Sequence, residues 1–117
     1  MIDISKIIEK ELLGYSKNIQ NKMSAAATEI SKEAVRELKS TSPKLTGEYG
    51  KSWMSTKTHS GGEVIYNKNH YRLTYLLEHG HAKRRGGRVQ AYPHIKKVEE
   101  KAVNEFIEKV EKAASEG

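Results

Sequence analysis

The sequence predicts an α+β domain, and three features of its pattern support that prediction. Apolar residues recur every three or four positions over residues 4–38 and again over residues 95–113, as on one face of a helix. Between these segments, residues 53–67 have the shorter period of β-strands and two adjacent glycines at a turn. A chain of 117 residues is long enough for one domain with one modest core, so we treat residues 1–117 as a single domain.

We expect a long first helix over about residues 3–40, with Asp3 as its N-cap and Pro43 beyond its end. A helix of about 36 residues would be roughly 54 Å long, which is more than a small core can cover. Two interpretations follow: the helix breaks near Gly14 and packs on a sheet, or its protruding half packs against another subunit. Its apolar stripe consists of Ile4, Ile8, Leu12, Tyr15, Ile19, Met23, Ala27, Ile30, Ala34 and Leu38.

Residues 48–92 are expected to hold the strands and a short middle helix. Two strands, 53–58 and 63–67, should form an antiparallel hairpin across Gly61 and Gly62, since glycine readily takes the positive φ of a tight turn. We expect Trp53, Val64 and Tyr66 to point into the core.

The short middle helix should span residues 70–79, capped by Asn69 and ended by Gly80, with Leu73, Leu76 and Leu77 as its buried edge. An exposed loop over residues 81–90 follows, and residues 89–92 could return as a strand. The last helix, over residues 93–114, is expected to pack on the sheet. Its apolar stripe is Ile95, Val98, Ala102, Phe106, Val110 and Ala113.

Positive charge is concentrated in one part of the chain. Residues 68–97 contain eight lysines and arginines and one acid, Glu78, whereas the whole chain has a net charge of +6. This segment therefore carries the entire positive excess, and we expect partners to bind here. The candidate partner-binding residues are Lys83, Arg84, Arg85 and Arg88 in the loop and Lys96 and Lys97 in the first turn of the last helix.

The composition excludes several classes of protein. There is no cysteine, so neither a disulfide framework nor a thiolate zinc site can form. No long apolar run is present, and the first residues mix acids and bases, unlike a secretory signal. We therefore expect a soluble protein made in a cytoplasm, without a membrane partner.

The histidines around the loop suggest two kinds of site, a zinc site and a ribonuclease-like catalytic site. His79, His81 and His94 with Glu78 offer ligands suited to zinc, but His79 and His81 flank a glycine at a helix end, where side-chain directions are not fixed. The same residues beside Arg84 and Arg85 could act as acid and base in a ribonuclease-like enzyme, although no rigid frame is evident. We favour a non-enzymatic protein with no catalytic residue, metal or cofactor.

Nucleic-acid binding without catalysis is a further alternative for the basic loop. Lysines and arginines neutralise phosphates and give salt-sensitive affinity with little base specificity. The loop has no interleaved aromatic residue, and a protein partner could equally order it.

Taken together, the motifs resemble the Hong Kong 97-type minor tail component family of tailed bacteriophages and prophages. The resemblance covers nearly the whole chain, and its ordered set of motifs is more specific than any one of them. Two segments depart from the family pattern: Tyr49 replaces an aliphatic residue, and residues 92–98 differ, which puts in doubt any family contact at the start of the last helix. The matching pieces are residues 42–53 (SPKLTGEYGKSW), 64–67 (VIYN), 71–81 (YRLTYLLEHGH), 86–89 (GGRV) and 93–95 (PHI).

The resemblance implies a structural virion protein of the phage neck or tail that acts in head–tail joining or tail completion. Such a subunit forms a homo-oligomeric ring of six copies through contacts with neighbouring neck and tail proteins. It stays monomeric in the host bacterial cytoplasm until it meets the growing assembly. No catalytic residue and no cofactor come with the resemblance. It leaves open whether the basic loop meets a neighbouring subunit or the DNA that passes through the ring.

Overall fold

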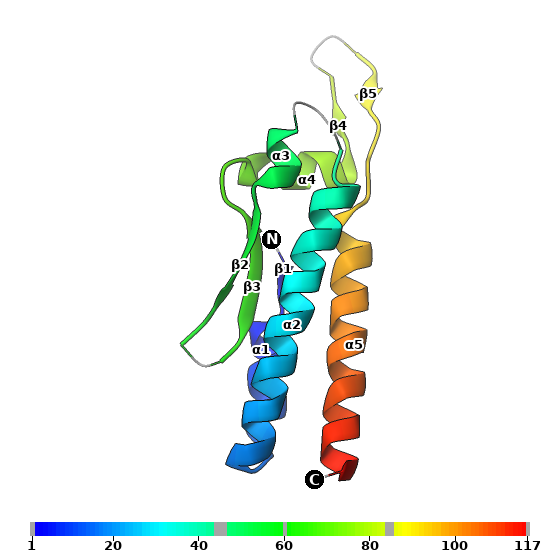
Figure 1. The fold of residues 1–117 in the computed structure, drawn as a ribbon. Coiled ribbons are helices and arrows are strands. Elements are labelled where there is room, and N and C mark those ends of the chain that lie inside the picture. The colour runs from blue at the N-terminus through cyan, green and yellow to red at the C-terminus, as the bar shows by residue number, and fades with distance from the viewer. Residues whose placement is uncertain (1, 44–46, 60, 84–85, 117) are drawn as a thin grey trace.

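The computed structural model describes residues 2–43, 47–59, 61–83 and 86–116. Helices and a small sheet form an elongated α+β molecule with principal extents of 58 × 22 × 21 Å. Two long helices, α2 (Lys17–Thr41) and α5 (Ile95–Glu116), lie side by side in antiparallel directions and define its long axis (Figure 1). Each buries the apolar stripe that its sequence predicts.

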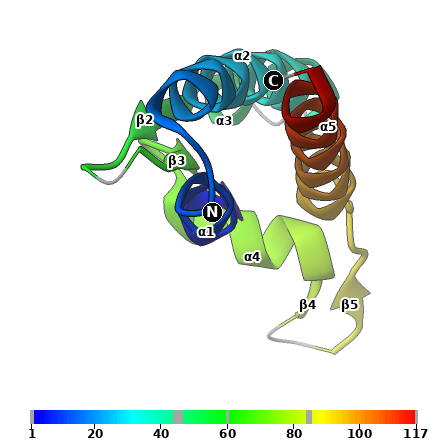
Figure 2. The ribbon, with the colours of Figure 1, turned by 90° about the horizontal axis from the view of Figure 1, so that it is seen from below.

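The expected first helix is present in two parts. A short helix, α1 (Ser5–Leu12), precedes α2, and the chain turns between them, so α1 packs back against α2 (Figures 1 and 2). Ser16 caps α2 by accepting a hydrogen bond from the Ile19 N–H at 3.4 Å. The predicted break near Gly14 is therefore confirmed. Because α1 folds back on α2, the two helices together are shorter than one continuous helix would be. Residues on both sides of the break therefore share one core.

Three antiparallel strands form a sheet in the order β1-β3-β2. The predicted hairpin consists of β2 (Trp53–Lys57) and β3 (Glu63–Asn67). A strand that the sequence did not predict, β1 (Ile2–Asp3), pairs with the other side of β3. The N-terminus is thereby joined to the centre of the sheet.

The predicted inward face of β3 is wrong. Trp53 is buried as expected, but Ile65 is the buried apolar residue of β3, while Val64 and Tyr66 are half-buried. The register explains this result: Trp53 pairs with Asn67 and Ser55 with Ile65, and directly paired residues point to the same face of a sheet. A core around Trp53 therefore contains the odd-numbered residues of β3.

Two short helices complete the upper part of the molecule in Figure 1, namely α3 (Glu48–Lys51) and α4 (Tyr71–His79). The middle helix is where the sequence predicts it, but Asn69 is not its cap. The His70 N–H instead donates to Asn67 Oδ1 at 2.9 Å. Of its predicted edge, Leu73 and Leu77 are partly buried and pack against the core, but Leu76 is 38% exposed, so that part of the prediction is wrong. The fully buried residues of α4 are Thr74 and Glu78.

After α4, a second small sheet forms from β4 (His81–Ala82) and β5 (Arg88–Val89). The chain then enters α5. The sequence predicted that this helix packs on the sheet, but its main neighbour is α2, so that prediction is wrong. The reason is length: α5 has 22 residues, and a sheet of five-residue strands cannot cover its apolar stripe, whereas the 25 residues of α2 can.

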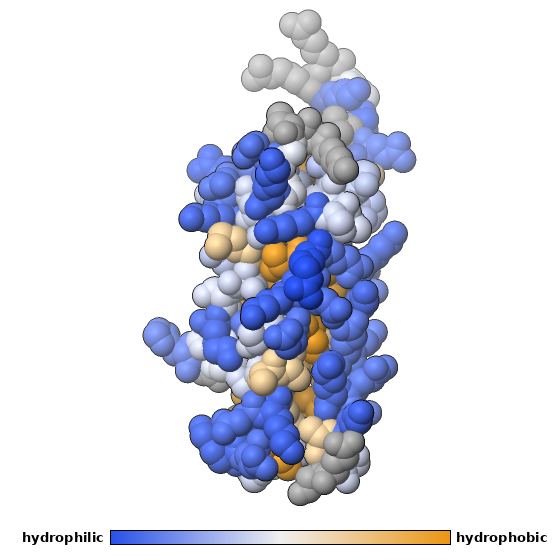
Figure 3. Space-filling model, viewed as in Figure 1, coloured by the Kyte–Doolittle hydropathy of each residue, from blue (hydrophilic) through white to orange (hydrophobic). Residues whose placement is uncertain are grey.

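The face of the molecule shown in Figure 3 is mostly hydrophilic. Hydrophobic side chains show on it as a narrow line between the two long helices, and hydrophilic residues flank that line. Among the described residues, no helix combines the length and the apolar character needed to cross a bilayer.

Candidate functional site

The basic segment lies at one end of the long axis. There β4 and β5 form a hairpin that extends past the ends of α2 and α5 (Figure 1). The Lys83 N–H donates to Gly87 O at 3.0 Å, and Gly86 and Gly87 have φ values of 95° and 79°. Such φ values are strained for other residues, so both glycines are needed for this turn.

Two hydrogen bonds fix the hairpin on α4. Arg88 Nη2 donates to the carbonyl oxygen of His79, the last residue of α4, at 3.1 Å. A guanidinium at this position also interacts favourably with the negative end of the helix dipole. After the hairpin, the Tyr92 N–H donates to Leu77 O at 2.7 Å. The direction in which the hairpin projects is therefore set by α4.

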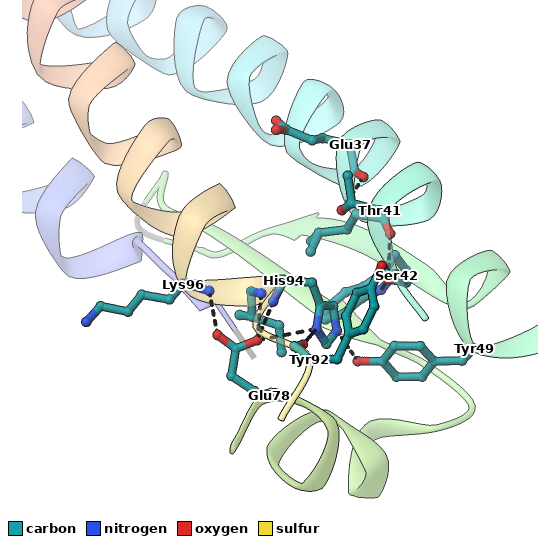
Figure 4. A network of polar contacts seen from close by, with 11 residues as sticks. Glu37, Thr41, Ser42, Tyr49, Glu78, Tyr92, His94 and Lys96 are labelled. Atoms are coloured by element: carbon teal, nitrogen blue, oxygen red, sulfur yellow. Dashed lines mark hydrogen bonds and ion pairs between the residues drawn. The ribbon is translucent and has the colours of Figure 1, made fainter. Parts of the chain in front are cut away.

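Glu78 caps the start of α5 from another helix. Its Oε1 accepts hydrogen bonds from the N–H groups of His94 at 2.7 Å and Ile95 at 2.8 Å, and its Oε2 accepts from Lys96 N–H at 3.0 Å (Figure 4). These N–H groups have no partner within the helix, and a carboxylate there also complements the positive end of the helix dipole. Burial raises the pKa of Glu78, but these three hydrogen bonds and the nearby His94 outweigh it, so the net pKa is lowered.

His94 is buried in the centre of a polar network. Its Nδ1 lies 2.7 Å from Tyr92 O and 3.3 Å from Glu78 Oε1, and its Nε2 lies 2.8 Å from the Tyr49 hydroxyl. A carbonyl oxygen can only accept, so Nδ1 carries a proton and donates to Tyr92 O, while the Tyr49 hydroxyl lies within hydrogen-bond distance of Nε2. Burial, followed by the charge of Glu78, raises the pKa of Tyr49, which keeps its hydroxyl protonated as a donor.

The same network reaches the end of α2 and the sheet. Trp53 Nε1 donates to Ser42 Oγ at 2.8 Å, and Ser42 Oγ donates to Leu38 O at 2.5 Å. Asn67 Nδ2 donates to Tyr49 O at 2.8 Å. We call Tyr49, Glu78, Tyr92 and His94 the polar hub. Because it connects α3, α4 and the start of α5, it fixes the position of the basic end relative to the core.

The structure separates the predicted partner-binding residues into two groups. Lys83, Lys96 and Lys97 have exposed side chains, as a binding role requires. Arg88 is exposed as well, but its guanidinium also donates a hydrogen bond to His79 O of α4. Arg84 and Arg85 lie outside the described residues.

In the part of the chain that the structure describes, no group of three or more candidate metal ligands is found, and the zinc alternative considered for His79, His81, His94 and Glu78 has no such cluster there. His94 is only 3% exposed, while His79 lies on the surface and packs against the Tyr75 ring. The side chain of His81 is outside the described set. Glu78 and His94 are adjacent, but the carboxylate caps α5 and the imidazole is enclosed, so this pair stabilises the fold.

Sequence reasoning missed the two residues that complete the polar hub, Tyr49 and Tyr92. One signal for a cap was available: the first turn of α5 contains two lysines and no acid. A helix start of that kind needs a carboxylate from elsewhere in the chain. Glu78 is the one acid in residues 68–97, which made it the nearest candidate.

Comparisons with protein-family models, with curated proteins and with solved structures found no match for this chain.

Proposed function

We propose that this chain is a structural subunit of a phage neck or tail, which acts in head–tail joining or tail completion and assembles as a ring of six copies. The observation that carries the proposal is the projecting basic hairpin at one end of an elongated molecule. The hairpin extends beyond the packed core, and Arg88 and the Tyr92 N–H donate hydrogen bonds to carbonyl oxygens of α4. A projection of this kind suits contact with another molecule better than it suits enclosing a substrate.

Most of the motifs that carry the family resemblance lie towards that end, whereas residues 64–67 belong to the central strand of the sheet. Residues 42–53 include the C-cap of α2, helix α3 and the start of β2; residues 64–67 lie in β3; and residues 71–81 form α4 and its end. Residues 93–95 lead into α5 and supply N–H groups to Glu78. Three of these motifs therefore supply Tyr49, Glu78 and His94 to the polar hub.

The enzyme alternative named the region of His79, His81, Arg84 and Arg85, of which the structure describes only part. For the neighbouring pair Glu78 and His94, this geometry gives it less support. Catalysis by Glu78 and His94 would require a substrate atom within hydrogen-bond reach of both groups. Glu78 already accepts three backbone hydrogen bonds, and both nitrogens of His94 have partners inside the protein. These contacts favour a structural role for the pair.

The proposal is tested by removing the gene from its parent phage and examining the particles by negative-stain electron microscopy. We expect filled heads and finished tails to accumulate separately, and the wild-type chain supplied in trans to restore joining. A variant with Lys83, Arg84 and Arg85 changed to alanine should fold normally but fail to restore it. Arg88 is retained because its contact with α4 is structural.

Two outcomes would count against this function. Joined, infectious particles at normal yield without the gene would remove the neck or tail role. Tight, salt-sensitive binding of the purified chain to nucleic acid, lost in the Lys83, Arg84 and Arg85 variant, together with unchanged particles, would favour the nucleic-acid-binding alternative.

A further inference from the structure

An open pocket lies between the sheet and α4, away from the basic hairpin. Its volume is about 480 Å³, and pockets that bind ligands have volumes of about 300–1,000 Å³ with mostly apolar walls and a few polar groups. We call it the β3–α4 pocket. It is lined by Val64, Tyr66, Asn67 and Lys68, from β3 and the position after it, and by Tyr71 and Thr74 of α4.

The β3–α4 pocket adjoins the face of the sheet that α2 does not cover. The side chains of Trp53 and Lys57 donate hydrogen bonds to serines of α2 and its C-cap, so α2 packs on the face to which these two residues point (Figure 2). Met54 and Tyr66 are paired directly across the strands and point to the opposite face. Met54 is 41% exposed. Apolar surface therefore continues from the pocket onto β2.

Apolar surface also continues from the pocket along α4. Tyr71 and Tyr75 are 61% and 70% exposed and stand four positions apart, on one face of the helix, and Leu76 is 38% exposed. Together with Met54, these are four of the eight exposed large hydrophobic residues in the part of the chain that the structure describes. Clustered exposed apolar residues mark sites of protein contact. A small molecule in the pocket would leave Met54 and Tyr75 uncovered, so a protein segment is the better match.

Two cations stand beside the pocket. Lys68 lines it, and the guanidinium of Arg72 lies 5.7 Å from the centre of the Tyr71 ring, with Nε donating to the Tyr71 hydroxyl at 3.2 Å. This bond leaves both NH₂ groups of Arg72 without a partner among the described residues. The acid on this face of the sheet is Asp3, opposite Val64, and its carboxylate already accepts hydrogen bonds from Ser5. A pre-oriented arginine is suited to a bidentate bond with a carboxylate.

A single-stranded nucleic acid fits this surface less well. Such a ligand stacks its bases on open aromatic rings. Here Arg72 covers one face of the Tyr71 ring, and the Tyr75 ring packs against His79 with centroids 4.6 Å apart. The pocket itself offers a valine and a threonine between its two tyrosines, which suits an aliphatic or aromatic side chain.

We infer that the β3–α4 pocket binds a segment of a partner protein in which a large apolar residue stands next to an aspartate or glutamate. The apolar side chain fills the space between Tyr66 and Tyr71. The neighbouring carboxylate bonds to Arg72, and Lys68 adds a second positive charge. Flanking residues of the segment lie over Met54 and Tyr75. This inference goes beyond the proposed function, because the site is separate from the basic hairpin and does not depend on the neck role.

Selection from a library of random peptides tests the inference without assuming a sequence. The immobilised wild-type chain should enrich peptides with aspartate or glutamate within two positions of a large apolar residue. Tyr71→Ser changes an exposed wall of the pocket and should enrich none of them. Ile107→Ser, which changes an exposed apolar residue of α5, is the matched control and should enrich the same peptides as the wild type. Circular dichroism confirms that each variant is folded.

Charge exchange with the most enriched peptide supplies a second test, measured by isothermal titration calorimetry. Arg72→Glu should weaken binding about tenfold or more. The same peptide with its acid replaced by lysine should bind the Arg72→Glu chain more tightly than the wild type. Lys109→Glu, at an exposed position of α5, makes the same change of charge away from the pocket and should leave the affinity unchanged.

Several results would overturn the inference. These are no enrichment by the folded wild type, enriched peptides that lack an acid, or an affinity that Arg72→Glu does not change. Equal binding of N-acetylphenylalanine would mean a small anion, and competition by oligothymidylate would mean a nucleic acid. Self-association of the wild type that Tyr71→Ser abolishes would mean a second copy. The particle experiment on the deleted gene decides the neck role independently of all these outcomes.

Discussion

Glu78→Gln should destabilise the whole molecule although it leaves the shape of the side chain almost unchanged. The carboxylate accepts three backbone hydrogen bonds at the start of α5. Glutamine keeps one carbonyl oxygen and presents an NH₂ group, which cannot accept, to the remaining donor. A hydrogen bond to a charged group contributes about 1.5–3 kcal/mol, and a charge at a helix end adds about 0.3–1 kcal/mol. We therefore expect the free energy of unfolding to fall by about 2–4 kcal/mol at pH 7.

The assay is urea-induced unfolding followed by circular dichroism, with Glu100→Gln as the matched control. Glu100 is an exposed glutamate of α5, the helix that Glu78 caps from α4. Its substitution removes the same charge without removing a cap. Its effect should stay within about 0.5 kcal/mol of the wild type.

The direction of the pKa shift of Glu78 determines how its contribution to stability changes with pH. The pKa of Glu78 in the folded state lies below its ordinary value of 4.5, so the stabilisation is fully present above that pH. It is lost as the pH falls through the lower folded-state pKa. The difference in stability between wild type and Glu78→Gln should therefore be largest near neutral pH and should shrink below about pH 4.5. An equal difference at pH 7 and pH 3, or none at pH 7, would refute the capping role.

Two further predictions concern packing and the polar hub. Tyr49→Phe leaves Nε2 of the buried His94 without its donor, so the free energy of unfolding should fall by about 1–3 kcal/mol in the same assay; an unchanged midpoint would contradict the assigned hydrogen bond. Gly62→Ala should lower the free energy of unfolding by about 1–3 kcal/mol, because the added Cβ would overlap Cα and Cβ of Ser5. Gly14→Ala is the control: nothing lies within 4 Å of its added Cβ, so stability should stay the same or rise. A larger loss at Gly14 than at Gly62 would show that this packing is wrong.

Local patterns predicted the elements well. The stripe over residues 4–38 continues across the break at Gly14, and Ile8 before the break and Met23 after it are both buried in one core. A glycine in the middle of a helical pattern marks a place where a break costs little. It does not say in which direction the chain leaves, because that depends on which surface lies nearby to cover α1.

The face of β3 shows the limit of strand patterns. Val64, Ile65 and Tyr66 are all apolar enough to be buried, so alternation alone does not choose between the two faces. The choice follows from pairing with β2, where Trp53 is opposite Asn67 and both are buried. Sequence reasoning identified Trp53 as a core residue but lacked the register that connects it with Ile65.

For the candidate site too, part could be predicted from the sequence and part depended on the tertiary structure. The concentration of cations in residues 68–97 was evident from composition, and the three lysines among the predicted binding residues have exposed side chains. The roles of Arg88 and Glu78 could not be predicted from the sequence, because each depends on a partner that folding brings close. Arg88 donates a hydrogen bond to His79 O, and Glu78 accepts one from the Ile95 N–H.

By itself, the sequence determined the two long amphipathic helices, the hairpin over residues 53–67 and the place of the positive charge. These depend on periodicity, turn residues and composition, which act over a few neighbouring positions. Only the tertiary structure decided that β1 joins the sheet, that α5 packs on α2, and that Glu78 caps α5 from 17 positions away. Those contacts join segments distant in the chain, and unpaired strand edges, apolar stripes and helix N–H groups find their partners only when the whole chain has folded.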